Sequence, residues 1–246
     1  MIAARIIAHR AGAALAPENT LAALALSAAL GVSWVEMDAR ILADDTVVVF
    51  HDDMLDRCTD GSGPIAERTW SQVRGLDAGS HFGARFTGEH IPRLDAVLRR
   101  CRERGLGLNL ELKVGAEGRR RALVTRTLAA IERSGLPLHR LLVSSFDSEA
   151  LRLCRRLRPD VRLAEIFDRM PADPSALVRD TGIICINVDW RSLDELAVRR
   201  AHVAALEVYA WTANDAAAFA PLWQWGIDGV FTDDPRTFLH HAAVPR

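Results

Sequence analysis

Two pairs of charged residues stand two positions apart inside otherwise apolar runs of this 246-residue chain. Glu36 and Asp38 lie in "VEMDAR", and Glu111 and Lys113 lie in "LNLELK". Successive side chains of a strand point to opposite faces, so the members of each pair share a face. Three carboxylates with no cysteine beside them suit a hard cation, Mg²⁺ or Ca²⁺. The alternative is a metal-free charge network in which Lys113 and Arg10 neutralise the acids.

Two histidines follow apolar runs in the same way. His9 ends "RIIAH" and His51 ends "TVVVFH". Because each follows an apolar run that is expected to be a strand, both histidines should open at the same edge as the acids. Two imidazoles beside a metal suit general acid and base catalysis. His139, His202, His240 and His241 are typical of solvated or capping positions, whereas both interpretations stay open for His81 and His90.

The elements that must position these groups alternate along the chain. Short β-rich runs are expected near 5–9, 34–39, 106–113, 140–145, 162–166, 184–188, 206–211 and 229–232. Helical patterns follow them near 18–31, 94–104, 118–134, 147–158, 173–181, 192–202 and 214–225, with one more at the end. Eight strand–helix pairs, with an extra extended piece at 46–51, favour an α/β protein with a (β/α)8 TIM barrel. A doubly wound sheet is the structural alternative, although no glycine-rich phosphate loop supports it.

Composition limits the classes of function. The chain is 49% hydrophobic, and its 31 Lys and Arg residues nearly balance 32 Asp and Glu residues, so nucleic acid is not an expected partner. No apolar stretch approaches the length of a membrane span, and the apolar start of the chain is too short for a secretory signal. The four cysteines show no metal or redox spacing. We therefore expect a cytoplasmic protein without stable membrane insertion.

Several segments, taken in order, resemble one known family. They are "AHRAGAALAPENTLAA", "VEMDARILADDTVVVFHDDMLDRCTDGSG", "LELK", "LLVSSF", "VYAWTAN" and "GIDGVFTDDP". Together they are similar to the motifs of the glycerophosphodiester phosphodiesterase (GDPD) family, in its bacterial cytoplasmic form, over almost the whole chain. The combination is specific, whereas each motif alone is weak.

The resemblance implies one TIM-barrel domain over residues 1–246, with a substrate-covering insertion after the second strand at about 52–93. It also implies a role for each matching residue: metal binding for Glu36, Asp38 and Glu111, acid/base catalysis for His9 and His51, phosphate binding for Arg10 and Lys113, and a place in the substrate pocket for Trp211. In the insertion, Phe82 is expected to line the pocket. The alternative is that Phe82 packs in a small satellite core with its aromatic neighbours.

The implied reaction is the metal-dependent hydrolysis of a glycerophosphodiester to glycerol 3-phosphate and an alcohol, which belongs to lipid and glycerol metabolism. The partner would be a small-molecule diester such as glycerophosphocholine or glycerophosphoethanolamine. Direct attack by water and a cyclic phosphate intermediate both remain open, and our interpretation favours His51 as the acid. A lysophospholipase D or a sphingomyelinase D-like enzyme is the alternative on the same site. A homodimer is compatible with these expectations.

Three positions depart from the family pattern: Ala11 where Gly is common, Val114 where Pro is frequent, and "NVDW", which lacks a histidine that some relatives have. A binding module that had lost catalysis would lack one of the expected acids or histidines. None of these departures removes one. An aldolase would need a Schiff-base lysine of low pKa. Lys113 is the only lysine, and its acidic neighbours favour the charged amine.

Overall fold

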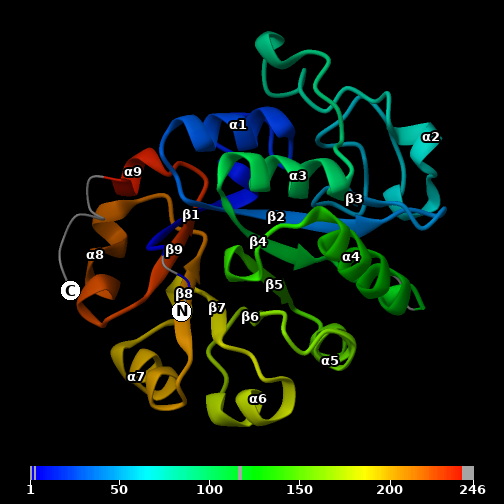
Figure 1. Cartoon of the computed structure of the whole chain (residues 1–246). Helices are drawn as coiled ribbons and strands as arrows, with labels where there is room; N and C mark the ends of the chain where they lie inside the picture. Colours follow the sequence, from blue (N-terminus) through cyan, green and yellow to red (C-terminus); the bar gives the residue numbers. More distant parts are fainter. Residues whose placement is uncertain (1, 3, 116–117, 240–246) are drawn as a thin grey trace.

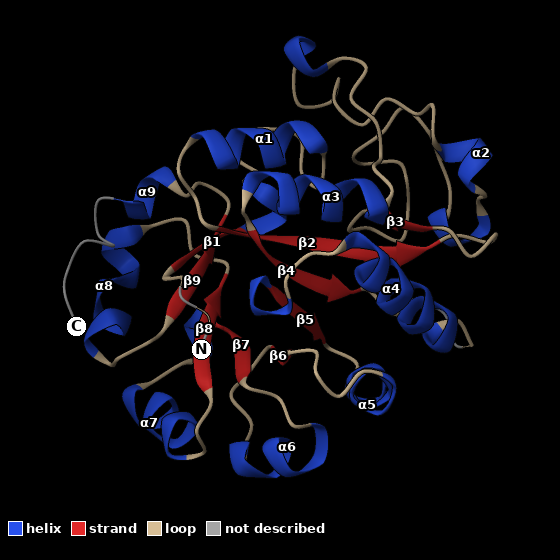
Figure 2. Ribbon diagram, in the orientation of Figure 1, coloured by secondary structure: helices blue, strands red, loops and turns tan. Residues whose placement is uncertain are grey.

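Eight parallel strands close into a barrel in the computed structural model, which describes residues 2, 4–115 and 118–239 (Figures 1 and 2). The barrel strands are β1 (Ile6–Ala8), β2 (Trp34–Ile41), β4 (Gly107–Leu112), β5 (Leu141–Ser145), β6 (Leu163–Phe167), β7 (Cys185–Asp189), β8 (Glu207–Trp211) and β9 (Gly229–Thr232). Each pairs in parallel with its neighbours, and β1 closes the ring by pairing with both β9 and β2. The predicted TIM barrel is confirmed.

Helices surround the barrel, and each of them except the last, which follows β9, joins one strand to the next (Figure 2). They are α1 (Leu21–Ala29), α3 (Leu94–Arg104), α4 (Arg120–Ser134), α5 (Ser148–Leu157), α6 (Pro174–Thr181), α7 (Glu195–Val203), α8 (Ala216–Gln224) and the short α9 (Arg236–Leu239). Four of these helices have an aspartate as the N-cap residue, whose carboxylate accepts hydrogen bonds from free N–H groups of the first turn. The helix expected from residue 18 begins at Leu21, since the Thr20 side chain accepts a hydrogen bond from Ala23 N and caps it.

The strands are buried on both faces, as expected for a parallel sheet covered by helices. A large apolar layer lies between strands and helices, and a smaller cluster that includes Trp34, Tyr209 and Phe231 fills one part of the barrel interior. Trp34 fits there because β4 starts with Gly107, where an added Cβ would lie 2.2 Å from the indole ring. Trp34, Glu36 and Asp38 alternate along β2, so the same inward face is apolar at one end and acidic further on.

The extra extended piece forms β3 (Val47–Val49), which pairs antiparallel with the last residues of β2. From there to α3, residues 52–93 form the expected excursion, with short helical turns η2 (Ile65–Glu67), α2 (Trp70–Val73) and η3 (Ala84–Phe86). This insertion has an apolar cluster of its own, which includes the fully buried Ile65 and Val73. It lies beyond β3, at the far end of β2 from β1 (Figure 1).

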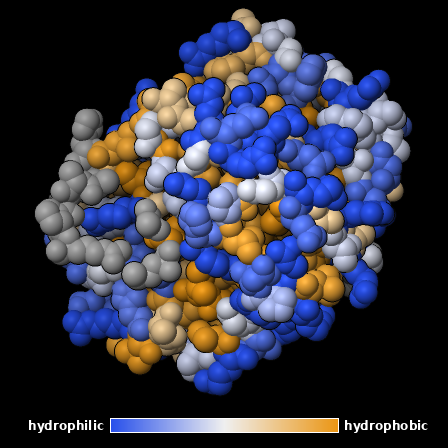
Figure 3. All heavy atoms as spheres, viewed as in Figure 1, coloured by the Kyte–Doolittle hydropathy of each residue, from blue (hydrophilic) through white to orange (hydrophobic). Residues whose placement is uncertain are grey.

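Within the described residues, none of the helices has the length and apolar character needed to cross a bilayer. Hydrophilic side chains cover most of the face seen in Figure 3, with hydrophobic patches between them. All four cysteines are buried and free, so disulfides do not contribute to the stability of this fold.

Candidate active site

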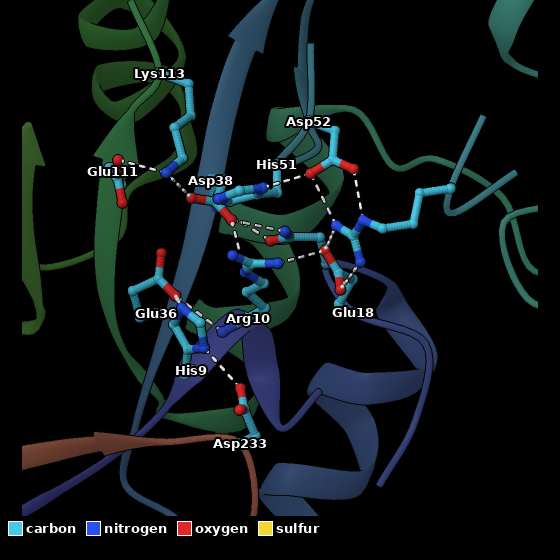
Figure 4. A network of polar contacts seen from close by, with 12 residues as sticks. His9, Arg10, Glu18, Glu36, Asp38, His51, Asp52, Glu111, Lys113 and Asp233 are labelled. Carbon is cyan, nitrogen blue, oxygen red and sulfur yellow. Dashed lines mark hydrogen bonds and ion pairs between the residues drawn. The ribbon is translucent and has the colours of Figure 1, made fainter. Parts of the chain in front are cut away.

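Three carboxylates from two neighbouring strands meet at the mouth of the barrel (Figure 4). Parallel pairing places Asp38 directly opposite Glu111, and Glu36 lies two residues earlier on the same face of β2. One oxygen of each side chain lies within 4.8 Å of one oxygen of each of the others. All three residues are buried, with 3%, 1% and 8% of their surface exposed for Glu36, Asp38 and Glu111. The acids predicted to converge therefore do so.

These acids are only partly neutralised by protein cations. Lys113 Nζ lies 2.7 Å from Glu111 Oε1 and 3.3 Å from Asp38 Oδ1. Burial and the negative charge of Asp38 raise the pKa of Glu111 to about 7, even with Lys113 beside it. Burial, with Asp38 and Glu111 nearby, raises the pKa of Glu36 well above its usual value. Burial also opposes ionisation of Asp38, but Lys113, His51 and Arg10 lower its pKa below the usual range.

This donor set fits a hard divalent cation. Glu36 Oε1 is buried and has no hydrogen-bond partner in the described part of the chain, so an acceptor is left for an ion. The three carboxylates offer oxygen ligands alone, which Mg²⁺ and Ca²⁺ prefer. A second group of close ligand atoms, from Glu18, His51 and Asp52, does not fit, because Arg57 donates hydrogen bonds to both carboxylates.

The first loop supports the acids through its backbone and its asparagine. Arg10 N donates a hydrogen bond of 2.8 Å to Glu36 Oε2, and Arg10 and Ala11 adopt the left-handed region with φ of 48° and 63°. Such strain costs about 1–2 kcal/mol per residue and is found at functional sites. Asn19, also left-handed, donates to Asp38 Oδ2 at 2.8 Å and accepts from Asp38 N at 3.1 Å.

His9 faces the acids with its ring held by a carboxylate. Its Nδ1 donates to Asp233 Oδ1 at 2.7 Å, and its Nε2 lies 3.9 Å from Glu36 Oε2. Asn214 Nδ2 donates to the other oxygen of Asp233 at 2.7 Å. The hydrogen bond to Asp233 fixes the tautomer, because a carboxylate can only accept. The Nε2 atom of His9 is therefore the one that faces the acids.

His51 is held in a similar way on the opposite side of the acids (Figure 4). Its Nδ1 donates to Asp52 Oδ1 at 2.6 Å, and Asp52 also accepts from Arg57 Nε at 2.6 Å. Burial lowers the pKa of His51 below its usual value, although Asp38 acts against this. The pKa of Asp52 is lowered by its hydrogen bond from Arg57, so this carboxylate stays ionised. Arg57 also binds Glu18, which in turn accepts from Arg10 Nη1 at 2.9 Å.

A pocket of about 210 Å³ lies over these groups. Its lining includes both histidines, Arg10, Lys113 and two of the acids, together with Asn109, Phe146, Ile166, Asn187, Trp211, Thr212 and Phe231. Trp211 therefore lines the pocket, and its ring meets Phe146 edge to face at a centroid distance of 5.9 Å. The Oδ1 atoms of Asn109 and Asn187 are buried without a hydrogen-bond partner among the described residues, so they are acceptors for ligand hydroxyls.

Phe82 does not line this pocket. It packs edge to face on Phe86 at 5.5 Å within the insertion, so its expected contact with substrate stays a prediction. In "NVDW", Asn187 reaches the pocket, whereas Asp189 accepts a hydrogen bond from Arg191 N and caps a short turn.

Several neighbours of the site are absent from the predicted set: Asp52, Arg57, Asp233 and the pocket residue Phe146. For two of them the sequence held a signal, because Asp52 directly follows His51 and Asp233 directly follows β9. An acid at a strand end on the active-site edge is a natural partner for an imidazole. Arg57 gave no such signal, since its reach to Glu18 depends on how the insertion folds.

Known proteins resemble this chain in fold and in sequence. Residues 9–237 match the model of the glycerophosphoryl diester phosphodiesterase family. A putative glycerophosphodiester phosphodiesterase of Bacillus subtilis (strain 168) is 34% identical over 239 residues, covering 94% of each chain. A phosphodiesterase of Oleispira antarctica, solved in complex with the product sn-glycerol-3-phosphate, superposes with a TM-score of 0.92 at 32% identity, covering 98% of this chain and 97% of that one. A putative glycerophosphoryl diester phosphodiesterase of Silicibacter pomeroyi superposes with a TM-score of 0.85 at 29% identity, covering 97% and 94%.

The fold and the site define a class of protein: a (β/α)8 barrel whose mouth joins a cluster of carboxylates to two oriented imidazoles. The matches above specify the family within that class. The chain belongs to the glycerophosphoryl diester phosphodiesterase family.

Proposed function

We propose that this protein hydrolyses glycerophosphodiesters to glycerol 3-phosphate and an alcohol in a reaction that depends on a divalent cation. The main support is the convergence of three buried carboxylates and two carboxylate-bound histidines on one pocket. The Oleispira relative, whose bound product is sn-glycerol-3-phosphate, adds support for this substrate class.

Glu36, Asp38 and Glu111 would hold the cation, Mg²⁺ or Ca²⁺. When bound, the cation supplies positive charge to the phosphate oxygens as negative charge grows on them. Lys113 and Arg10 line the same pocket and add positive charge there. Because the chain as a whole is nearly neutral, this local charge would provide the attraction for an anionic diester.

The two histidines would carry the proton transfers. One takes the proton of the attacking hydroxyl, and the other gives a proton to the oxygen of the departing alcohol, so the protons of this step balance. Proton exchange with water then returns each ring to its starting state. Asp233 and Asp52 hold the Nδ1 atoms, which leaves Nε2 of each ring for the reaction. A substrate with a p-nitrophenol leaving group distinguishes the two roles. Because p-nitrophenolate leaves without being protonated, turnover of this substrate should recover in the variant that lacks the general acid, but not in the variant that lacks the general base.

On the side next to Trp211, we expect a glycerol group without an acyl chain, because the pocket has a volume of only about 210 Å³. A lysophospholipase D or sphingomyelinase D-like activity remains the second candidate, because it would use the same acids and histidines. A cytoplasmic location and a homodimer stay predictions.

The test is an enzyme-coupled assay for glycerol 3-phosphate with glycerophosphocholine and glycerophosphoethanolamine as substrates. We expect turnover that EDTA abolishes and that added Mg²⁺ or Ca²⁺ restores. Turnover that EDTA leaves unchanged would refute the role of the cation. Parallel assays of choline release from lysophosphatidylcholine and sphingomyelin test the second candidate, and faster hydrolysis of either lipid would favour it.

A further inference from the structure

A second cavity joins the pocket at the acids. It measures about 900 Å³ and shares Glu111, Lys113 and Phe146 with the pocket of about 210 Å³. One of its walls is formed by residues 53, 54, 64, 66 and 67 of the insertion, and the other by the ends of β4 and β5 and the segments that follow them. We call this cavity the side groove. Because Glu111 and Lys113 belong to both cavities, any phosphate held there has one space on each side.

A phosphodiester needs two such spaces, since its phosphorus carries two alcohol groups. If the glycerol group occupies the pocket beside Trp211, the departing alcohol must lie elsewhere, within reach of the same phosphate. The side groove meets that condition, because it begins at the residues that the proposed function places around the phosphate.

The insertion wall of the side groove is held rigidly. Ile65 is fully buried in the cluster of the insertion, and its N–H donates to Asp53 O at 2.9 Å. Met54 and Pro64 form a bridge across this turn. Arg40 connects the wall to the catalytic centre, donating to Asp53 Oδ1 at 2.5 Å and to His51 O at 2.7 Å. The groove is therefore preformed beside one of the two histidines.

One acidic side chain of the side groove, Glu67, differs from the other charged residues of the lining. Most charged side chains that line it have a partner of opposite charge: Arg40 with Asp53, Arg119 with Asp45 (which also pairs with Arg126), Asp147 with Arg120, and Lys113 with Glu111. Glu67 lines the groove on an exposed turn, and no partner for its carboxylate is present among the residues that the structure describes. Glu67 thus adds a negative charge without a described protein partner to the lining, which favours a positively charged group on a ligand in the side groove.

Exposed apolar side chains accompany this charge. Met54 and Phe146 are 45% and 49% exposed, and both line the side groove. Apolar and aromatic surface next to a carboxylate suits a quaternary ammonium group, which is bulky, weakly hydrated and positively charged. A purely apolar ligand would leave Glu67 without a partner.

We infer that the side groove binds the departing alcohol of the diester, and that it selects an amino alcohol with a quaternary ammonium group. This inference rests on the proposed function. Glu67 supplies the charge and Met54 and Phe146 supply the apolar contact, while the glycerol group lies on the far side of the phosphate.

Two substrates of the same shape, one with a cationic and one with a neutral end group, test whether the groove selects a positive charge. One is glycerophosphocholine, and the other is its neutral isostere, in which a tert-butyl group replaces the trimethylammonium group. We expect the wild-type protein to prefer the choline ester in kcat/KM. Glu67→Gln should lower kcat/KM for the choline ester about two- to fivefold, as for an exposed ion pair, and leave the isostere unchanged. Glu132→Gln, an equal charge change on the exposed face of α4, serves as the matched control and should change neither value.

The outcomes separate the inference from the function. If the wild-type protein hydrolyses neither ester, the proposed function fails. If it hydrolyses both and Glu67→Gln changes both equally or neither, the function stands and the charge selection is overturned. If Met54→Gln removes a preference for acylated diesters while Glu67→Gln has no effect, the groove holds an acyl chain, which also overturns the inference. The melting temperature of each variant confirms that it is folded.

Discussion

Replacing Glu111 with Gln is expected to stabilise the metal-free protein above pH 7. Burial and the nearby Asp38 raise the pKa of Glu111 from 4.5 to about 7. Between these values the folded state keeps a proton that the unfolded state has lost. Stability therefore falls as pH rises through this window, by about 1.4 kcal/mol per pH unit, and levels off above it. Glutamine resembles the protonated acid and keeps an oxygen for Lys113, so the variant lacks this loss.

The size of the effect follows from the width of the window. A difference of about 2.5 pH units between 4.5 and about 7 corresponds to about 3 kcal/mol. For a chain of this size, that free energy raises the melting temperature by about 6–12 °C. At pH 4.5 the folded state is protonated and the unfolded state is half protonated, so the wild type and Glu111→Gln should differ little in stability.

Thermal unfolding with excess EDTA at pH 4.5 and pH 8 measures the effect, with Glu132→Gln as the control for a charge change on the surface. Added Mg²⁺ or Ca²⁺ should then stabilise the wild type and the control far more than Glu111→Gln. A Glu111→Gln variant that is less stable than the wild type at pH 8 would refute this account of the acids. An equal response of both proteins to the cation would refute Glu111 as a ligand.

The remaining predictions concern catalysis and metal binding. His9→Ala and His51→Ala should each lower turnover about 10²- to 10⁴-fold without unfolding the protein, as for a general acid or base; near-normal activity of both would contradict the mechanism. Asp233→Asn should lower kcat about 10- to 100-fold by loosening the ring of His9, yet leave cation affinity unchanged, and a drop in affinity would indicate a different role. Cation binding at pH 6 should release protons, because the raised pKa of Glu111 keeps that ligand protonated there, and affinity should increase with pH up to about 7. Calorimetry in two buffers of different ionisation enthalpy measures this release, and binding without release would contradict it.

The fold could be predicted because its signals are local and repeated. Alternation of short β-rich runs with helical patterns indicated the barrel, and the two-residue spacing of Glu36 and Asp38 placed them on one face. Even the extra piece at 46–51 was visible as a strand. Its antiparallel pairing with the end of β2 was not, because pairing direction depends on the turn between them. Helix ends shifted by a few residues where a cap such as Thr20 decided the start.

The support around the acids was harder to predict because it joins distant segments. Asp233 lies 224 residues from His9, and only barrel closure between β9 and β1 brings them together. Arg57 meets Glu18 through the path of the insertion, for which the sequence offers no period. The sequence also did not distinguish the roles of two phenylalanines: Phe82 packs on Phe86 within the insertion, whereas Phe146 lines the pocket.

A crystal structure of the protein grown with Mn²⁺ and glycerol 3-phosphate tests the central proposal most directly, because manganese scatters anomalously and resembles Mg²⁺ in its ligands. We predict an anomalous peak bounded by Glu36, Asp38 and Glu111, with a phosphate oxygen as a further ligand and both histidines facing the phosphate. An empty carboxylate cluster at saturating Mn²⁺, or a phosphate bound away from it, would contradict the proposal.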